Sequence, residues 1–222
     1  MTRLVLKVGG AVAAGAARHV LELVAAGNEV ILVHGAGPQI SSELAARGIP
    51  AEFVGGRRVT SAEAIAVVRE ALVEVNQQLC AELGDSAIGL IGDEIGLQAT
   101  RVAELGLVGD PSPSRPEAIE NALAAGRIPV VAPLAAGPLN VNADEMAAAL
   151  AVGLGADRIF FLTDVAGLLL DGAVVDRIEA DDADRLLADG LLEGGILPKL
   201  RAAVTAARLG VDAEIGRTAV VA

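Results

Sequence analysis

Short apolar segments, each ending near a glycine or proline, recur along this chain and alternate with helical patterns. Two lie early, at 4–8 (LVLKV) and 29–35 (EVILVHG), and two lie later, at 127–133 (RIPVVAP) and 157–164 (DRIFFLTD). The first two lead directly into helical patterns, after KVGG and after HGAGP. Such an alternation is typical of βαβ units, whose strands run parallel. The pattern therefore predicts an α/β fold with a mainly parallel sheet.

The middle of the chain is less regular. We expect a hairpin at 53–60 (FVGGRRVT), a long helix at 61–84 and strands within 87–102. The one strong loop signal, GDPSPSRPE at 109–117, is too short to link two independent domains. We therefore expect residues 1–222 to form a single domain.

Composition argues against several classes of protein. A chain of 222 residues that is 53% hydrophobic can bury a large core, and with three Phe, no Trp and no Tyr that core must be aliphatic. The near absence of aromatic rings removes the platforms on which single-stranded nucleic acid stacks. A net charge of −12 argues against nucleic-acid and anionic-membrane surfaces, because both need cationic patches. We expect no nucleic-acid partner and no membrane.

Cysteine usage and the apolar segments predict the compartment. Cys80 is the single cysteine, so the chain forms no internal disulfide, as in a reducing cytosol. No apolar run reaches the roughly 18 residues of a membrane span. The start, MTRLVLKVGG, enters the first strand pattern without a signal-peptide core. We expect a cytoplasmic protein.

The distribution of lysine singles out two positions. Of the 17 residues that are Lys or Arg, only Lys7 and Lys199 are lysine, and each lies within a few residues of a Gly-Gly pair. An ammonium group is a compact point charge on a flexible stem, whereas guanidinium is a rigid planar fork. A site that follows a moving phosphate oxygen therefore favours lysine. Chance retention of two lysines is the alternative explanation.

Four segments rich in glycine or asparagine lie where predicted strands end or helices begin. They are KVGG, HGAG, PLNVNAD and LTDVAG. In open α/β sheets ligands bind beyond the carboxyl ends of strands, where exposed amides and helix dipoles attract phosphate or carboxylate. Each segment taken alone is equally well explained as a tight turn. None matches G-x-x-x-x-G-K-[ST] or G-x-G-x-x-G, so P-loop and dinucleotide sites lose support.

Six segments occur in the order found in the amino acid kinase family, which this chain resembles from residue 4 to about residue 209. They are LVLKVGG, ILVHGAGPQI, GRRVT, LNVNADEMAA, FLTDVAG and GGILPKLRAA. The resemblance implies a three-layer αβα sandwich around a mainly parallel sheet. It also implies an N-terminal lobe, 1–138, that binds an acyl amino acid, and a C-terminal lobe, 139–222, that binds the nucleotide.

Within this family the motifs are most similar to those of the branch that phosphorylates the side-chain carboxylate of N-acetyl-L-glutamate, using ATP and Mg²⁺. The product is an acyl phosphate of arginine biosynthesis. The resemblance assigns catalysis to Lys7, Lys199 and Asp144. Asp144 would orient both lysines by charge-assisted hydrogen bonds. A carboxylate that only stabilises a helix start is the alternative role for Asp144.

The same resemblance assigns two further groups of residues. The acetylglutamate site is expected to contain Ala36, Gly37, Arg58, Asn140 and Asn142. The nucleotide site is expected to contain Gly9, Gly10, Gly35, Thr163, Asp164, Gly167 and Leu168. Arg58 would bind the α-carboxylate as a bidentate fork, and the two asparagines would hold the acetamido group or else cap the next helix. No residue is assigned to a metal ion.

Two titratable neighbours of these residues are expected to have no direct role. Arg57 should face solvent, because neighbouring residues of a strand point to opposite faces. His34 should be structural, because a carboxylate nucleophile is already ionised at pH 7 and needs no general base.

The chain departs from the family pattern in three places. Ala36 stands in Gly35-Ala36-Gly37, where family members usually have three glycines, and the end, GRTAVVA, is shorter than the usual closing helix and strand. The chain also starts directly before the first strand, without the N-terminal helix of the arginine-regulated hexameric members. We therefore expect a homodimer that arginine does not inhibit.

Other functions remain as alternatives. A related kinase acts on aminoadipate or glutamate bound to an acidic carrier protein, which would favour a basic rim, whereas this chain carries a net charge of −12. Relatives that phosphorylate UMP, carbamate or free glutamate are disfavoured by GRRVT and NVNAD together. A catalytically weak ligand-binding homologue would explain Ala36 and the short C-terminus. Retention of Lys7, Lys199 and Asp144 favours an enzyme.

Overall fold

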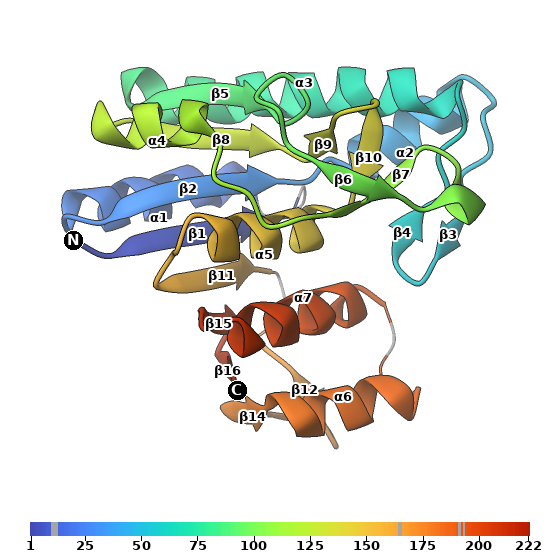
Figure 1. Ribbon diagram of the computed structural model, residues 1–222. Helices are drawn as coiled ribbons and strands as arrows, with labels where there is room; N and C mark the ends of the chain where they lie inside the picture. Colours follow the sequence, from blue (N-terminus) through green and yellow to red (C-terminus); the bar gives the residue numbers. More distant parts are fainter. Residues whose placement is uncertain (10–12, 164–165, 191, 193) are drawn as a thin grey trace.

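An eight-stranded sheet forms the centre of the computed structural model, which describes residues 1–9, 13–163, 166–190, 192 and 194–222. The strand order is β14-β16-β15-β11-β1-β2-β8-β5 (Figure 1). In that order the strands span Arg177–Glu179, Thr218–Val221, Asp212–Ile215, Arg158–Leu162, Arg3–Val8, Glu29–His34, Ile128–Ala132 and Ala87–Ile91. All neighbouring strands are parallel except β15 and β16. The predicted mainly parallel sheet is confirmed.

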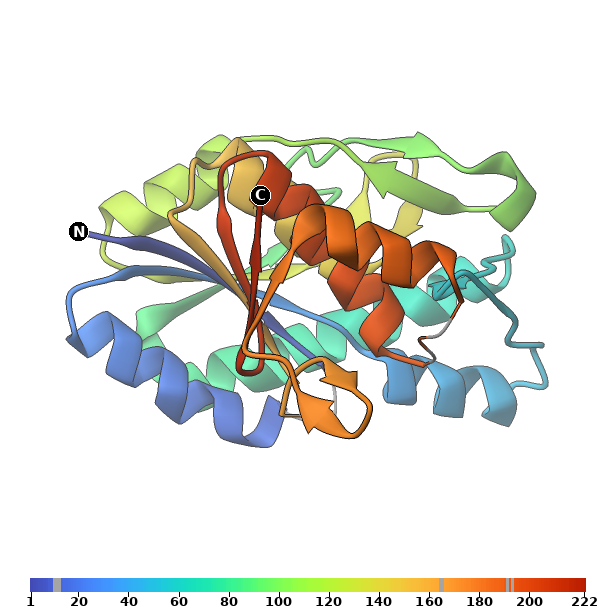
Figure 2. The same ribbon diagram turned by 90° about the horizontal axis from the view of Figure 1, so that it is seen from below.

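Helices cover the two faces of this sheet, as Figure 2 shows. One face carries α1 (Ala13–Ala25), α2 (Gly37–Ala46) and α3 (Ala64–Leu83). The other carries α4 (Glu117–Ala124), α5 (Ala143–Gly153), α6 (Ala180–Ala188) and α7 (Ile196–Arg208). Within the described ranges, every helix is too short or too polar to cross a membrane. The chain therefore has the three-layer αβα sandwich that the resemblance implies.

Smaller elements flank the central sheet. A second sheet has the order β6-β7-β10-β9, with strands at Ala99–Arg101, Val108–Pro111, Leu139–Val141 and Leu134–Ala135. Two hairpins pair β3 (Phe53–Val54) with β4 (Arg57–Arg58), and β12 (Leu169–Leu170) with β13 (Ala173–Val174). Short 3-10 helices lie at Gly84–Ser86 and Ala103–Leu105. The hairpin expected within 53–60 and the long helix expected at 61–84 are confirmed.

The loop expected at 109–117 is wrong over its first three residues. Gly109, Asp110 and Pro111 belong to β7, which pairs antiparallel with β6 and parallel with β10. Pro111 lacks an N–H group, but the pairing of β7 with β10 stops at Gly109, so Pro111 has a neighbouring strand on one side only, as in an edge strand. Pairing with two neighbouring strands therefore outweighs the turn composition of this segment.

Alternate residues of one strand belong to two different hydrophobic cores. In β1, Leu4 and Leu6 pack with residues of α1, α2 and α3, whereas Val5 packs with residues of α5 and α7. Because side chains of a strand alternate between the faces, Lys7 projects to the same side as Val5. The alternation therefore directs the Lys7 ammonium toward α5.

The proposed boundary between two lobes, at residue 138, falls in the turn between β9 and β10. Strands from both segments belong to the same central sheet, in which β1 pairs with β11 from Leu4–Arg158 to Val8–Leu162. The assignment of an acyl-amino-acid lobe and a nucleotide lobe stays a prediction.

His34 is a buried polar residue at the end of β2. It is 1% exposed, and its Nε2 lies 3.1 Å from Nδ2 of Asn76 on α3. The same Asn76 group donates to the carbonyl of Val130 at 2.8 Å. Burial lowers the pKa of His34 to about 4, so the imidazole is neutral at pH 7. These contacts fit the structural role expected for His34.

Gly153 ends α5 at a close approach to the backbone of Ser114. A Cβ at Gly153 would overlap the backbone nitrogen and oxygen of Ser114. We expect Gly153→Ala to lower the free energy of unfolding by about 2 kcal/mol, as over-packing does. For Gly15 in α1, such a Cβ would have no heavy atom of another described residue within 4 Å, outside its own helix backbone and chain neighbours. Gly15→Ala should raise stability by roughly 0.5 kcal/mol, as alanine replaces glycine in a helix. Urea unfolding checks both variants, and equal effects would contradict this account.

Titration of His34 should make stability depend on pH. Its folded pKa of about 4 lies below the ordinary value of 6.5, so as pH falls the unfolded chain binds the proton first. The contribution of neutral His34 is complete above the unfolded pKa and is lost as pH falls toward the folded one. The loss is roughly 3 kcal/mol, at about 1.4 kcal/mol per pH unit. His34→Gln does not titrate, so its unfolding free energy should vary less between pH 7 and pH 4. Parallel curves for the two proteins would refute this.

Candidate active site

Two ammonium groups and one carboxylate meet at the carboxyl end of β1. Nζ of Lys7 lies 2.9 Å from Oδ1 of Asp144, and Nζ of Lys199 lies 3.7 Å from Oδ2 of the same carboxylate. Lys7 and Asp144 are 5% and 4% exposed, so their ion pair is buried. Lys199 also donates to the carbonyl of Gly195 at 3.2 Å. The structure therefore brings together the three residues that the resemblance assigns to catalysis.

The local sequence explains how Asp144 comes to face the lysines. Oδ1 of Asn142 accepts hydrogen bonds from the N–H groups of Asp144 and Glu145, at 2.9 and 3.3 Å, and so caps α5. The cap fixes where the helix begins, and the helix dipole favours carboxylates in its first turn. A favourable helix start accounts for an acid at this position. It does not account for the contacts of Asp144 with both lysines.

A cavity of about 250 Å³ opens beside these three residues, and we call it the acceptor cavity. Lys7 and Asp144 line it, together with Gly9 and Gly35. Its lining also contains every residue expected in the acetylglutamate site, namely Ala36, Gly37, Arg58, Asn140 and Asn142. The residues assigned to the acceptor from widely separated motifs therefore lie around one space.

Ala36, which stands where the family usually has glycine, fits its position. Its φ is −138°, a value that any residue adopts, so its Cβ causes no backbone strain. The next residue, Gly37, begins α2, with Pro38 in the first turn. Both line the acceptor cavity, so the positive end of the α2 dipole lies at a place suited to an anion.

Arg58 is a buried guanidinium without a carboxylate partner among the described residues. Its Nη2 donates to the hydroxyl of Ser41 at 2.7 Å and to the carbonyl of Gly37 at 3.2 Å, and the group lies 4.5 Å from the ring centroid of Phe53. Its Nη1 is buried and has no hydrogen-bond partner within the described part of the chain. Burial lowers the pKa of Arg58. An anion in the cavity would offset the cost of burying this charge.

The two asparagines connect this region to the β3–β4 hairpin. Asn140 donates to the hydroxyl of Thr60 at 3.0 Å, and Thr60 donates to the carbonyl of Arg58 at 2.8 Å. Asn142 caps α5 and also donates to the carbonyl of Gly56 at 3.3 Å. The helix-capping alternative therefore applies to Asn142. Thr60 was not among the expected site residues, although its bonds help to place Arg58.

The residues expected to bind nucleotide are more scattered. Gly10 and Asp164 lie outside the described residues, and Thr163 lines a different cavity of about 300 Å³, together with His19 and Glu214. Gly167 packs tightly against the Thr218 hydroxyl. Leu168 is fully buried, and its N–H donates to that hydroxyl at 2.8 Å. The carbonyl of Leu168 accepts the N–H of Val175 at 2.9 Å, so both backbone polar groups of Leu168 are engaged within the protein.

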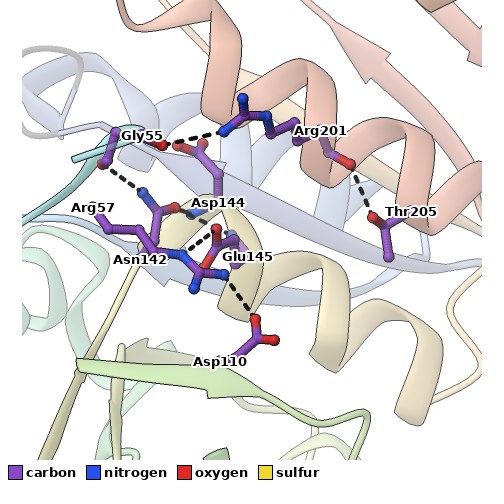
Figure 3. A network of polar contacts seen from close by, with 9 residues as sticks. Gly55, Arg57, Asp110, Asn142, Asp144, Glu145, Arg201 and Thr205 are labelled. Atoms are coloured by element: carbon purple, nitrogen blue, oxygen red, sulfur yellow. Dashed lines mark hydrogen bonds and ion pairs between the residues drawn. The ribbon is translucent and has the colours of Figure 1, made fainter. Parts of the chain in front are cut away.

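Arg57 is not directed into solvent, so the expectation from strand alternation is wrong. Its Nε donates to Glu145 at 2.9 Å and its Nη2 to Asp110 at 2.7 Å, and the side chain is 22% exposed (Figure 3). Burial raises the pKa of Glu145, and the hydrogen bond from Arg57 opposes that rise. Alternation predicts the direction of Cα–Cβ, but a long side chain bends back toward acids of other elements. No local motif marks Glu145 or Asp110.

No group of three or more His, Cys, Asp or Glu side chains is placed to hold a metal ion in the described part of the chain. Asp144, the carboxylate nearest to the proposed chemistry, is engaged by the two lysines.

Comparison with known proteins identifies the family. The family model described as "Amino acid kinase family" matches residues 2–216. The acetylglutamate kinase of Rubrobacter xylanophilus is 42% identical, over 97% of this chain and 88% of the relative. The acetylglutamate kinase of Geobacillus stearothermophilus is 40% identical, over 81% of this chain and 74% of the relative.

Solved structures agree with the fold. The crystal structure of smu.665 from Streptococcus mutans UA159 superposes with a TM-score of 0.91 and 29% identity, covering 99% of this chain and 98% of that one. Carbamate kinase from Giardia lamblia, with 16% identity, has the same fold with a TM-score of 0.71, over 99% of this chain and 98% of its own. From its matched length, its motifs and its fold, this chain belongs to the amino acid kinase family.

Proposed function

We infer that this chain transfers the γ-phosphoryl group of ATP to the side-chain carboxylate of N-acetyl-L-glutamate, in arginine biosynthesis. Acetylglutamate kinases that are 40% to 42% identical to it over most of its length support this activity. The observation that carries the mechanism is the convergence of Lys7 and Lys199 on Asp144 beside the acceptor cavity.

The reaction brings two anions together. An oxygen of the acceptor carboxylate attacks the γ-phosphorus in line, and the bond from that phosphorus to the bridging oxygen of ADP breaks. ADP leaves with the electron pair of that bond, and the acceptor becomes an acyl phosphate. The carboxylate is already ionised at pH 7, so no proton has to be removed. Catalysis therefore consists of positioning and of stabilising negative charge.

We assign Lys7 to the transferring phosphoryl group and Lys199 to the nucleotide phosphates. Lys7 lines the acceptor cavity from the end of β1. Lys199 lies in the first turn of α7, where the helix dipole also favours phosphate. Asp144 holds both ammonium groups before the substrates bind and offsets their mutual repulsion. A flexible ammonium can then follow an oxygen as it moves from ATP toward the acceptor.

The acceptor would be held by the residues of the acceptor cavity. Among the described residues Nη1 of Arg58 has no hydrogen-bond partner and Nη2 is partly engaged, which supports the assignment of the α-carboxylate to Arg58. The amides of Ala36 and Gly37, at the start of α2, would add hydrogen bonds to an anionic group. We assign the acetamido group to the neighbourhood of Asn140 and Asn142, which line the same cavity.

Kinases of this family use ATP, and we propose that Mg²⁺ arrives bound to the phosphates of ATP, neutralising part of their charge. The residues that we propose for the nucleotide are Gly9, Gly10, Gly35, Thr163, Asp164, Gly167 and Leu168. The homodimer and the cytoplasmic location likewise stay predictions.

The proposed acceptor is tested by an assay of ADP release that offers N-acetylglutamate, glutamate and UMP in parallel. We expect strong turnover with N-acetylglutamate alone, because Arg58 and the asparagines match a carboxylate and an acetamido group on one molecule. Strong turnover with glutamate or UMP would contradict the assignment. Absence of ADP release with all three would favour a catalytically weak homologue.

The need for an ammonium group at the end of β1 is tested by Lys7→Arg. A rigid guanidinium keeps the charge but does not follow the moving oxygen, so we expect kcat to fall about a hundredfold. KM for each substrate should change much less. Arg185→Lys serves as the control, since Arg185 pairs with Asp182 on the exposed side of α6. Full activity of Lys7→Arg would remove the explanation given for the two lysines.

A further inference from the structure

The β3–β4 hairpin carries Arg58 and Phe53 to the acceptor cavity, although each of its strands has only two residues. A hairpin this short is not stable in water by itself. Its turn residues, Gly55 and Gly56, have φ values of 58° and 84°, which favour glycine. The position of Arg58 therefore depends on the contacts that hold the hairpin from outside.

Arg57 makes the strongest of these contacts. It bridges Glu145, in the first turn of α5, and Asp110, in β7, with donor–acceptor distances of 2.9 and 2.7 Å (Figure 3). A guanidinium that binds two carboxylates through different nitrogens is fixed in orientation. Glu145 directly follows Asp144, so Arg57 ties the hairpin to the helix turn that holds the two lysines.

Weaker contacts join the hairpin to α5 and α7. Asn142 donates to the carbonyl of Gly56, and Arg201 donates to the carbonyl of Gly55, each at 3.3 Å. A Cβ on Gly56 would lie 3.4 Å from Cγ of Pro198, so that ring packs against the turn. Two of these contacts are single hydrogen bonds and the third is an apolar contact, so each contributes less than a bridge of two ion pairs.

We propose that Arg57 is a positioning residue for the acceptor, which acts by fastening the hairpin to Glu145 and Asp110. Its Nε and Nη2 are already engaged by these acids, so Arg58 keeps the role of binding the acceptor carboxylate. Without Arg57 the hairpin keeps its weaker contacts but is held less firmly, and acceptor binding must order it more fully at the expense of affinity. ATP binding carries no such cost. The choice of acceptor rests on the proposed function.

The test compares KM for N-acetylglutamate and KM for ATP in Arg57→Ala and Arg57→Lys. We expect Arg57→Ala to raise KM for the acceptor about tenfold, the scale of a lost charge-assisted hydrogen bond. KM for ATP and kcat should stay within about twofold of wild type. Arg57→Lys should recover part of the loss, because an ammonium still pairs with Glu145 but does not bridge both acids.

Arg3→Ala is the matched control. Arg3 also bridges two acids, Glu29 and Glu120, at 2.8 and 3.0 Å, and its side chain is 17% exposed. It begins β1, whereas Lys7 lies near the other end of that strand. Arg3→Ala should lower stability without changing either KM. If it raises KM for the acceptor as Arg57→Ala does, or if Arg57→Ala leaves that KM unchanged, the positioning role is wrong.

A double-mutant cycle tests whether Arg57 acts on acceptor binding through its contact with Glu145. Glu145→Gln should raise KM for the acceptor, and the double variant Arg57→Ala/Glu145→Gln should be little worse than Arg57→Ala, because both substitutions break the same contact. Additive effects would overturn this route.

Hydrogen exchange separates failure of this inference from failure of the proposed function. If wild type releases no ADP with N-acetylglutamate, the proposed function is wrong. In that case amide exchange at residues 53–58 still tests whether Arg57 holds the hairpin in place, since the exchange measurement needs no substrate. Faster exchange of these amides in Arg57→Ala than in Arg3→Ala supports the role of Arg57 in holding the hairpin, and equal exchange in both variants overturns it.

Discussion

The pairing of two lysines with one buried carboxylate is the constraint on which the rest of the structure depends. Burying an ion costs on the order of several kcal/mol unless an opposite charge and hydrogen bonds compensate it. Asp144 compensates Lys7 directly, at 2.9 Å, and Lys199 more loosely, at 3.7 Å. Three elements, β1, α5 and α7, must therefore terminate or begin at one point. A parallel sheet allows this because strand ends and helix starts gather along one edge.

Much of the fold follows from local pattern. The apolar runs at 4–8 and 29–35 predict β1 and β2 because strands buried on both faces are continuously apolar. The segment at 109–111 is the opposite case. Its glycine and proline predict a loop, but in the structure the segment pairs with β6 and β10 as part of a sheet. A local sequence pattern does not show which strands, far away in the sequence, will pair with a segment.

The candidate site, like the fold, has residues that the sequence predicts and residues that it does not predict. Lys7 was recognisable because it is one of only two lysines and lies beside a glycine pair, and Asp144 because it belongs to the NVNAD segment that resembles the family. Arg57 was not, because the direction of a long side chain depends on acids supplied by α5 and β7. The sequence motif predicts Arg58 as a site residue. Its burial, and the lack of a hydrogen-bond partner for Nη1 within the described ranges, are evident only from the packing of the hairpin.

The scarcity of lysine has a chemical consequence for an enzyme that makes an acyl phosphate. Such a product acylates neutral amines, whereas guanidinium groups stay protonated and are poor nucleophiles. Besides the N-terminus, Lys7 and Lys199 carry the only amines of the chain, and both lie beside the carboxylate of Asp144. A surface whose cationic side chains elsewhere are all arginine is correspondingly resistant to modification by the product of the reaction itself.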